Sequence, residues 1–175
     1  KKEFNNFSRN RNLSLNTICK YKNEQWDWGE ISSNHNLTIQ WIEIFKLKNW
    51  DFKKVSNNPN LSLFWIKKYP YFEWDTYLLS NHKNLTLAWI ESMPNFRWDW
   101  EGISSNENLE LDWLVKYNYW PWQFENIYAN KKITLEWLKT FRNKNWNWNY
   151  LSIHQSLTLE WIDEFPNKEW NWNYI

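Results

Sequence analysis

The sequence contains very little cysteine and glycine and has no long apolar segment. Cys19 is the one cysteine, so no disulfide can form within the chain and no group of thiolates can hold a metal. A reducing, intracellular setting is the simpler interpretation of that count. Gly29 and Gly102 stand alone, which excludes a glycine-rich loop that cradles phosphates. No apolar run approaches the roughly 20 residues that a membrane-spanning helix needs.

An excess of either charge is also missing. The chain has 21 Lys and Arg residues against 20 Asp and Glu residues, and its formal net charge is +1. A protein that binds the phosphate backbone of nucleic acid normally carries a clear excess of Lys and Arg on one face. We therefore expect no nucleic-acid partner and no membrane partner.

Aromatic residues are abundant, and they recur with a fixed period. They make up 21% of the 175 residues, and 18 of them are Trp. A 24-residue repeat starts at Asn12, Asn36, Asn60, Asn84, Asn108, Lys132 and Ser156. A fixed short period is typical of stacked repeats. Residues 1–11 are then the tail of a preceding repeat, and residues 12–175 are six full repeats and a truncated seventh in one continuous solenoid, which we interpret as part of a longer array.

The first half of each repeat predicts a helix of about two turns. Counting Asn84 as position 1, positions 6, 7 and 10 are apolar in nearly every repeat and share one helical face. Ser or Thr at position 3, replaced by Glu110 in one repeat, is a good N-cap because its hydroxyl can accept from a free backbone amide. Proline follows position 10 in three repeats, at Pro70, Pro94 and Pro166, where a helix should end.

The second half predicts a shorter helix over positions 17 to 21. Position 15 is always Trp, position 16 is Asp, Asn or Gln, and position 20 is aliphatic. With position 16 as N-cap, positions 15 and 20 form a hydrophobic staple. The predicted fold is therefore all-α, a solenoid of tandem 24-residue helix hairpins. A leucine-rich repeat is the alternative, because positions 2, 4 and 6 alternate as a strand would, although the apolar position 7 breaks that alternation.

The sequence indicates no catalytic, cofactor-binding or metal-binding residue. The three histidines, His35, His82 and His154, lie in different repeats, and the last two replace the Asn of position 23. The carboxylates at position 16 suggest a metal ladder at first, but Asn147 and Asn171 replace them later in the chain. An amide caps a helix nearly as well as a carboxylate and is a poor ligand for hard cations. We therefore interpret position 16 as a helix cap and expect no enzyme activity.

The turn between the two helices, at positions 12 to 14, changes character along the chain. It is polar in the outer repeats and apolar in the middle ones. Clustered exposed aromatic side chains mark interaction surfaces. The candidate partner-binding residues are Leu47, Tyr71, Phe72, Phe96, Tyr119 and Trp120. The alternative is that each side chain folds back on its own hairpin.

The repeat pattern N-L-T-L-x-W-I-x-x-F-P-x-x-x-W-D-W-x-x-I-S-x-N, clearest in Asn84–Asn106 and Ser156–Ile175, resembles tryptophan-rich tandem repeats in proteins of large eukaryotic DNA viruses, the giant-virus and insect-poxvirus groups. The similarity covers Asn12–Ile175, and Thr17, Thr76 and Gln123 depart from the pattern. The resemblance implies a viral protein without enzymatic activity, and it transfers no catalytic residue.

Together these patterns predict a non-enzymatic scaffold for protein–protein interaction or viral structural assembly. It would bind a protein partner, or further copies of itself through the array, in the cytoplasm of a host cell or in the virion. The alternative is a lectin-like module that stacks sugars on exposed Trp. Helical spacing favours a core role for the Trp residues of positions 6 and 15.

Overall fold

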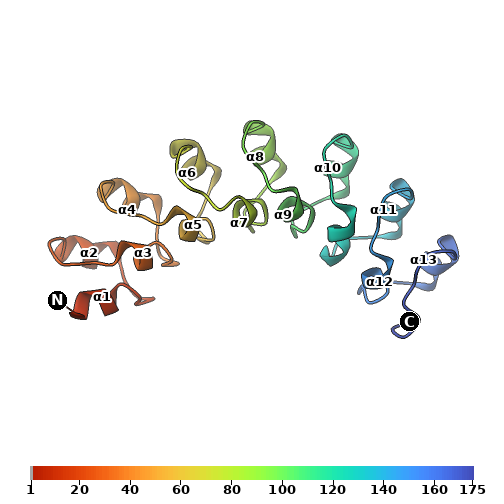
Figure 1. Cartoon of the computed structure of the whole chain (residues 1–175), viewed down its shortest axis with the longest axis horizontal. Coiled ribbons are helices and arrows are strands. Elements are labelled where there is room, and N and C mark those ends of the chain that lie inside the picture. Colours follow the sequence, from red (N-terminus) through yellow and green to blue (C-terminus); the bar gives the residue numbers. More distant parts are fainter. Residues whose placement is uncertain (1) are drawn as a thin grey trace. The chain divides into compact units, whose positions relative to one another are not determined.

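The computed structural model describes residues 2–175, and over that range helices joined by turns are the only regular secondary structure (Figure 1). Fourteen short helices and no strand are present among these residues. The all-α prediction is thereby confirmed. The leucine-rich alternative, which requires a strand in each repeat, is wrong.

Longer and shorter helices alternate along the chain. The longer ones are α2 (Leu15–Lys20), α4 (Ile39–Ile44), α6 (Leu63–Lys68), α8 (Leu87–Ser92), α10 (Leu111–Lys116), α11 (Leu135–Thr140) and α13 (Leu159–Glu164). The shorter ones are α3 (Trp28–Ile31), α5 (Phe52–Val55), α7 (Thr76–Ser80), α9 (Trp100–Ser104), the 3₁₀ helix η1 (Phe124–Ala129) and α12 (Trp148–Leu151), and α1 (Lys2–Phe7) precedes them all. These bounds correspond to positions 4–9 and to about positions 17–21, as the sequence predicts.

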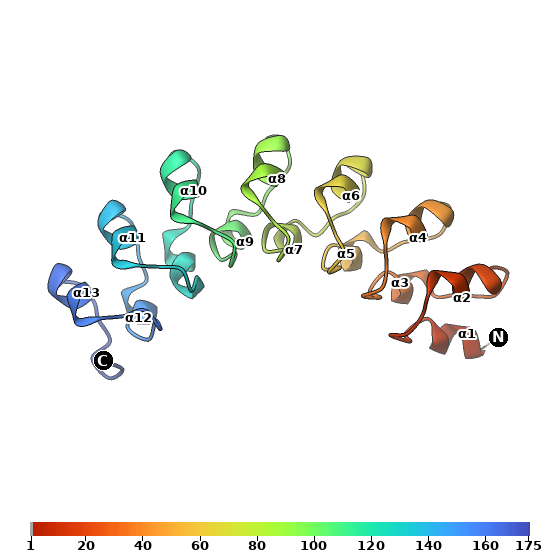
Figure 2. The ribbon, with the colours of Figure 1, turned by 180° about the vertical axis from the view of Figure 1, so that it is seen from behind.

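The chain divides into two compact units, Lys1–Asn84 and Leu85–Ile175. In the N-terminal unit, α2, α4 and α6 form one row and α1, α3, α5 and α7 form a second row (Figures 1 and 2). In the C-terminal unit, α8, α10, α11 and α13 form one row, and α9, η1 and α12 form the other. That residues 12–175 form one continuous array stays a prediction.

Tryptophan and aliphatic side chains fill the space between the rows of each unit. The Trp of position 6 is at most 8% exposed in every repeat that has one. The aliphatic residue of position 20 is fully buried in the first six repeats, whereas Ile175, in the seventh, is 44% exposed. The Trp of position 15 is buried too, except for Trp50, which is partly exposed. The predicted core role of these Trp residues is confirmed.

The Trp of position 15 also makes a polar contact that phenylalanine could not make. Its indole Nε1–H donates to the carbonyl oxygen of position 10, the residue that ends the longer helix, as Trp74 does to Tyr69 over 2.9 Å. The same bond recurs in the six other repeats at 2.8 to 3.1 Å. A carbonyl at a helix end needs such a partner when it is removed from water.

The two predicted N-caps have different outcomes. At position 16 the prediction is confirmed, because the side-chain oxygen accepts from the backbone amide three residues later at 2.9 to 3.2 Å, in Asp27, Asp51, Asp75, Asp99 and Asn147. At position 3 the Ser or Thr residue has the extended backbone of an N-cap. Only Ser14, of the Ser and Thr residues at this position, also accepts a hydrogen bond from a backbone amide of the helix with its side chain. The expected hydroxyl cap is therefore wrong for the other Ser and Thr residues there.

Buried polar side chains at positions 21 and 23 connect each repeat to the next. Ser32 at position 21 donates to Trp28 O and accepts from the backbone amide of Asp51, which belongs to the following repeat. Asn58 at position 23 donates to Asn34 O, 24 residues earlier, at 2.9 Å. Equivalent bonds recur within both units. The sequence pattern alone gives no sign that positions 21 and 23 join consecutive repeats.

Candidate interaction surface

The six candidate residues separate into two classes according to their repeat position. Leu47, Tyr71 and Tyr119 occupy position 12, at the tip of the turn, and are 89%, 98% and 73% exposed. The other four repeats have an asparagine at this position, in Asn23, Asn95, Asn143 and Asn167. Neither the turn nor the core therefore requires an apolar side chain at position 12.

Phe72, Phe96 and Trp120 occupy position 13, and their rings pack on other rings. Phe72 lies flat on Phe52 with ring centroids 4.0 Å apart and an angle of 12° between the planes. Trp120 lies flat on Tyr117 at 3.9 Å. Phe96 and Trp120 are only partly exposed. The alternative that each side chain folds back on its own hairpin thus describes Trp120 and Phe96, which packs on Trp98. Phe72 instead stacks on a ring of the preceding repeat.

Lysine at position 13 makes the equivalent contact with its ammonium group. Lys144 Nζ lies 5.5 Å from the ring centroid of Phe124, the residue at position 17 of the preceding repeat. Lys48 does the same over Trp28 at 5.6 Å, and Lys168 over Trp148 at 5.4 Å. In these three repeats, and in that of Phe72, position 13 therefore covers the ring at position 17 of the previous repeat, with either a stacked ring or a cation–π contact.

A cleft lies beside the exposed turns of the N-terminal unit. It has a volume of about 300 Å³ and is lined by Ile42, Lys46, Lys48, Asn49, Trp50, Phe52, Tyr69 and Phe72. A second hollow is also lined by Trp50, Phe52 and Phe72. Because Trp50 borders both hollows, it is less buried than the other Trp residues at position 15.

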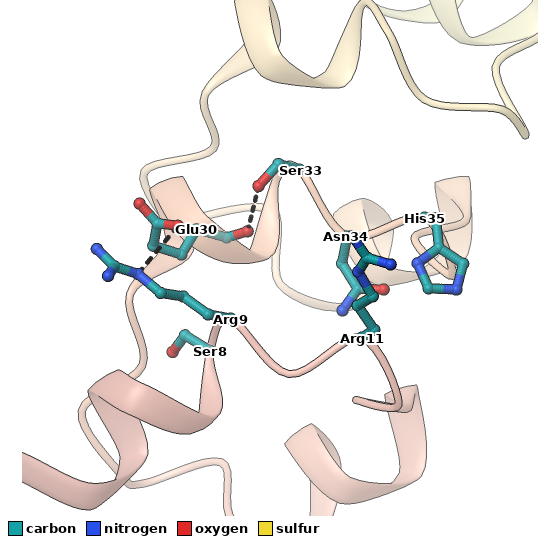
Figure 3. A pocket seen from close by; sticks show the side chains of 7 residues that line it. All are labelled: Ser8, Arg9, Arg11, Glu30, Ser33, Asn34 and His35. Carbon is teal, nitrogen blue, oxygen red and sulfur yellow. Dashed lines mark hydrogen bonds and ion pairs between the residues drawn. The ribbon is translucent and has the colours of Figure 1, made fainter.

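A larger hollow, of about 600 Å³, lies where α1 and α3 end (Figure 3). The carboxylate of Glu30 in its wall is paired with Arg9 at 3.3 Å and with Lys54 at 3.5 Å. Its two hydroxyls make backbone bonds, from Ser8 to Phe4 O and from Ser33 to Glu30 O. Neither serine is therefore available as a nucleophile, and the hollow shows no arrangement for acid–base chemistry.

Two of the histidines take over the role of the asparagine at position 23, as predicted. His82 Nε2 is 2.9 Å from Asn58 O, and its Nδ1 accepts from the Asn84 amide at 3.0 Å. Because Nδ1 accepts, the ring proton lies on Nε2. Burial lowers the pKa of His82 below its ordinary value, although the hydrogen bond to Asn58 opposes this shift, and the charge of Lys83 lowers the pKa further. His154 makes the equivalent contacts to Asn130 O and the Ser156 amide.

Within the described residues, no group of three or more His, Cys, Asp or Glu side chains is close enough to hold a metal ion. In that same range, every helix is too short or too polar to cross a membrane. Comparison of the chain with protein-family models, characterised proteins and solved structures gives no match.

Proposed function

We propose that this protein is a non-enzymatic scaffold, a solenoid of 24-residue helix hairpins whose exposed turns bind a protein partner. The observation that carries the proposal is the exposure of Leu47, Tyr71 and Tyr119 at a position where four other repeats have asparagine. Large apolar side chains of this exposure give the fold no core packing. Interaction surfaces are the usual place for them, and Tyr is enriched among residues that dominate binding energy.

The solenoid part of the proposal is supported by hydrogen bonds that join consecutive repeats within each unit. Asn36 Nδ2 donates to Arg11 O, 25 residues earlier, and Asn60 Nδ2 donates to His35 O at the same spacing. Contacts between neighbouring repeats are what hold repeat proteins together. The resemblance to viral tryptophan-rich repeats is compatible with a scaffold of this kind.

The burial of the Trp residues favours a protein partner over a sugar. A stacking platform must expose the face of its ring. The Trp residues at positions 6 and 15 are instead buried, apart from the partly exposed Trp50. A lectin-like protein would have to stack its sugar on aromatic rings other than the buried Trp residues of positions 6 and 15.

The test replaces the three turn residues by the residue found in other repeats, in the triple variant Leu47→Asn, Tyr71→Asn and Tyr119→Asn. We expect the melting temperature to be nearly unchanged, because these side chains are outside the core. We also expect partners recovered by affinity purification from expressing cells, measured by quantitative mass spectrometry, to be lost.

The matched control changes position 12 where it is already polar, with Asn23→Ser, Asn143→Ser and Asn167→Ser. This control should keep the recovered partners. Unchanged recovery with the first triple variant would place the binding surface elsewhere. A large fall in its melting temperature would show that the three side chains stabilise the fold instead.

A further inference from the structure

The cleft beside the turns of the N-terminal unit combines an apolar floor with a basic rim. The side chains of Ile42, Trp50, Phe52, Tyr69 and Phe72 form the floor. Lys46 and Lys48 line the same cleft. The two lysines flank the exposed Leu47, and Phe72 follows the exposed Tyr71, so the cleft is continuous along the chain with the proposed binding turns.

The acidic groups near this cleft already have partners. Asp51 accepts from the Lys54 amide, Glu43 is paired with Lys68, and Glu73 is 3.7 Å from Lys53. These carboxylates therefore leave the two rim lysines uncompensated.

The rim lysines have no such partner. No ion pair within residues 2–175 includes Lys46 or Lys48. The ammonium group of Lys48 lies over the Trp28 ring, a contact that leaves its charge in place. The rim therefore presents two positive charges that are in no ion pair with a carboxylate of the described residues.

We infer that this cleft binds an acidic peptide segment of a partner protein. One large apolar side chain of the segment enters the cleft between Trp50 and Phe72, and flanking Asp or Glu residues lie against Lys46 and Lys48. This inference rests on the proposed function, of which it specifies the partner. Small-molecule and cofactor pockets have volumes of roughly 300–1,000 Å³. A cleft at the lower limit of that range suits a single side chain better than a cofactor.

Charge complementarity selects the sign of the segment. Opposite charges across an interface raise the association rate and reject wrong partners. A nucleic acid is a poorer fit, because phosphate-backbone binding calls for a clear excess of Lys and Arg, and the chain as a whole has a net charge of only +1.

The test begins with short random peptides displayed on phage and selected on the whole folded chain. We expect enriched peptides to combine Phe, Leu or Trp with neighbouring Asp or Glu. A fluorescein-labelled synthetic peptide from this pool, titrated by fluorescence anisotropy, should bind more weakly at high salt, as an interaction between exposed charges does. Enrichment of basic or uncharged peptides would overturn the inference.

Two variants locate the binding in the cleft. Lys46→Asn removes a rim charge and introduces the residue that another repeat has at position 11, Asn118. Phe72→Lys makes the floor polar but preserves a cover for Phe52, since Lys144 covers Phe124 in this way. Lys46→Asn should weaken peptide binding about tenfold in low salt, and Phe72→Lys should abolish it, with melting curves confirming that both variants fold. Lys22→Asn, at position 11 of the preceding hairpin, is the matched control and should bind as the unmodified chain does.

The outcomes separate this inference from the function on which it rests. If peptide binding depends on Tyr71 but is unchanged by Lys46→Asn and Phe72→Lys, the turns bind a partner and the cleft inference is wrong. If the selected peptides bind the Leu47→Asn, Tyr71→Asn, Tyr119→Asn variant normally but are lost with Lys46→Asn and Phe72→Lys, the cleft inference holds and the turns, which carry the proposed function, take no part in this binding. Displacement of the peptide by a single-stranded oligonucleotide at equal concentration would show a general anion surface and would also overturn the inference.

Discussion

Asparagine at position 23 shows how one residue can connect two repeats. Asn58 Nδ2 donates to Asn34 O, and its Oδ1 accepts from the Asn60 amide at 2.8 Å. The backbone carbonyl of Asn58 in turn accepts from His82 Nε2. An imidazole can replace the amide because it also offers one donor and one acceptor on opposite sides.

This geometry predicts different costs for two substitutions of Asn58. Asn58→Ala leaves the partly buried Asn60 amide without its partner and removes one of the two donors to Asn34 O, which keeps its bond from the Leu37 amide. It should therefore lower the free energy of unfolding by roughly 1–3 kcal/mol. Asn58→His should cost within about 1 kcal/mol, because histidine supplies both bonds at two other repeats. Urea unfolding measures both values. Equal losses would show that the side chain's shape, rather than its hydrogen bonds, matters here.

Stability should depend on pH through His82. Because burial lowers its pKa in the folded chain, the unfolded chain binds the proton first, at its ordinary pKa of about 6.5. Below that pH, protonation favours the unfolded state, so the free energy of unfolding falls as the pH falls from about 6.5 toward the lower folded-state pKa. Protonation of Nδ1 would also remove its bond from the Asn84 amide.

The control for this prediction is His82→Asn, which restores the side chain that other repeats use at position 23. Urea unfolding at about pH 7.5 and about pH 5.5, on either side of the ordinary histidine pKa, should show a smaller loss of stability for the variant. The same pH dependence in both proteins would mean that His82 takes no part in it.

At the scale of one element, η1 differs from the other short helices in its N-cap, because Gln123 has one methylene group more than Asp or Asn. The shorter helix of the other complete repeats begins at Asp or Asn, whose side chain reaches the amide three residues later. Gln123 has a longer side chain, and its Oε1 accepts from Asn126 Nδ2 at 2.8 Å instead of from the backbone. Position 21 also differs there, because Tyr128 replaces the serine and stacks on Tyr150 at 4.3 Å. The segment forms a 3₁₀ helix rather than an α-helix.

Restoring the cap at this element should stabilise the protein. Gln123→Asp supplies a side-chain acceptor for the Asn126 amide, which now donates to the backbone oxygen of Gln123 at 3.0 Å, and so restores the capped start of the other short helices. We expect a gain of about 1 kcal/mol and a rise in melting temperature of about 2–4 °C. Gln123→Ala serves as a control and should give no such gain. A Gln123→Asp variant that melts no higher would show that Tyr128, rather than the missing cap, determines the local conformation.

At the scale of the molecule, none of these helices is long enough to be stable alone. Isolated helices shorter than about 12–15 residues are marginal in water, and the longest α-helices here have six residues. Stability must therefore come from packing and hydrogen bonds between repeats, which follow the 24-residue period within each unit.

Removing one whole repeat should therefore be tolerated. Deletion of residues 36–59 brings Asn60 to the place of Asn36, where its amide can donate to Arg11 O and Leu13 O as Asn36 does. We expect a helical circular-dichroism spectrum and cooperative unfolding at a lower temperature. Deletion of residues 36–47 removes half a repeat and destroys this register, so it should abolish cooperative unfolding. Equal behaviour of the two deletions would show that the period does not govern the fold.

The sequence by itself determined the period, the two helices of each repeat, the Trp core and the caps at position 16. These features rest on contacts within a few residues along the chain, such as the bond from the Lys54 amide to Asp51, or on the spacing of one helical face. Only the tertiary structure decided which turn side chains are exposed. Tyr71 and Phe72 are adjacent and both aromatic, yet Tyr71 is 98% exposed while Phe72 lies flat on a ring of the preceding repeat. That difference depends on where the neighbouring repeat lies, which local sequence spacing does not specify.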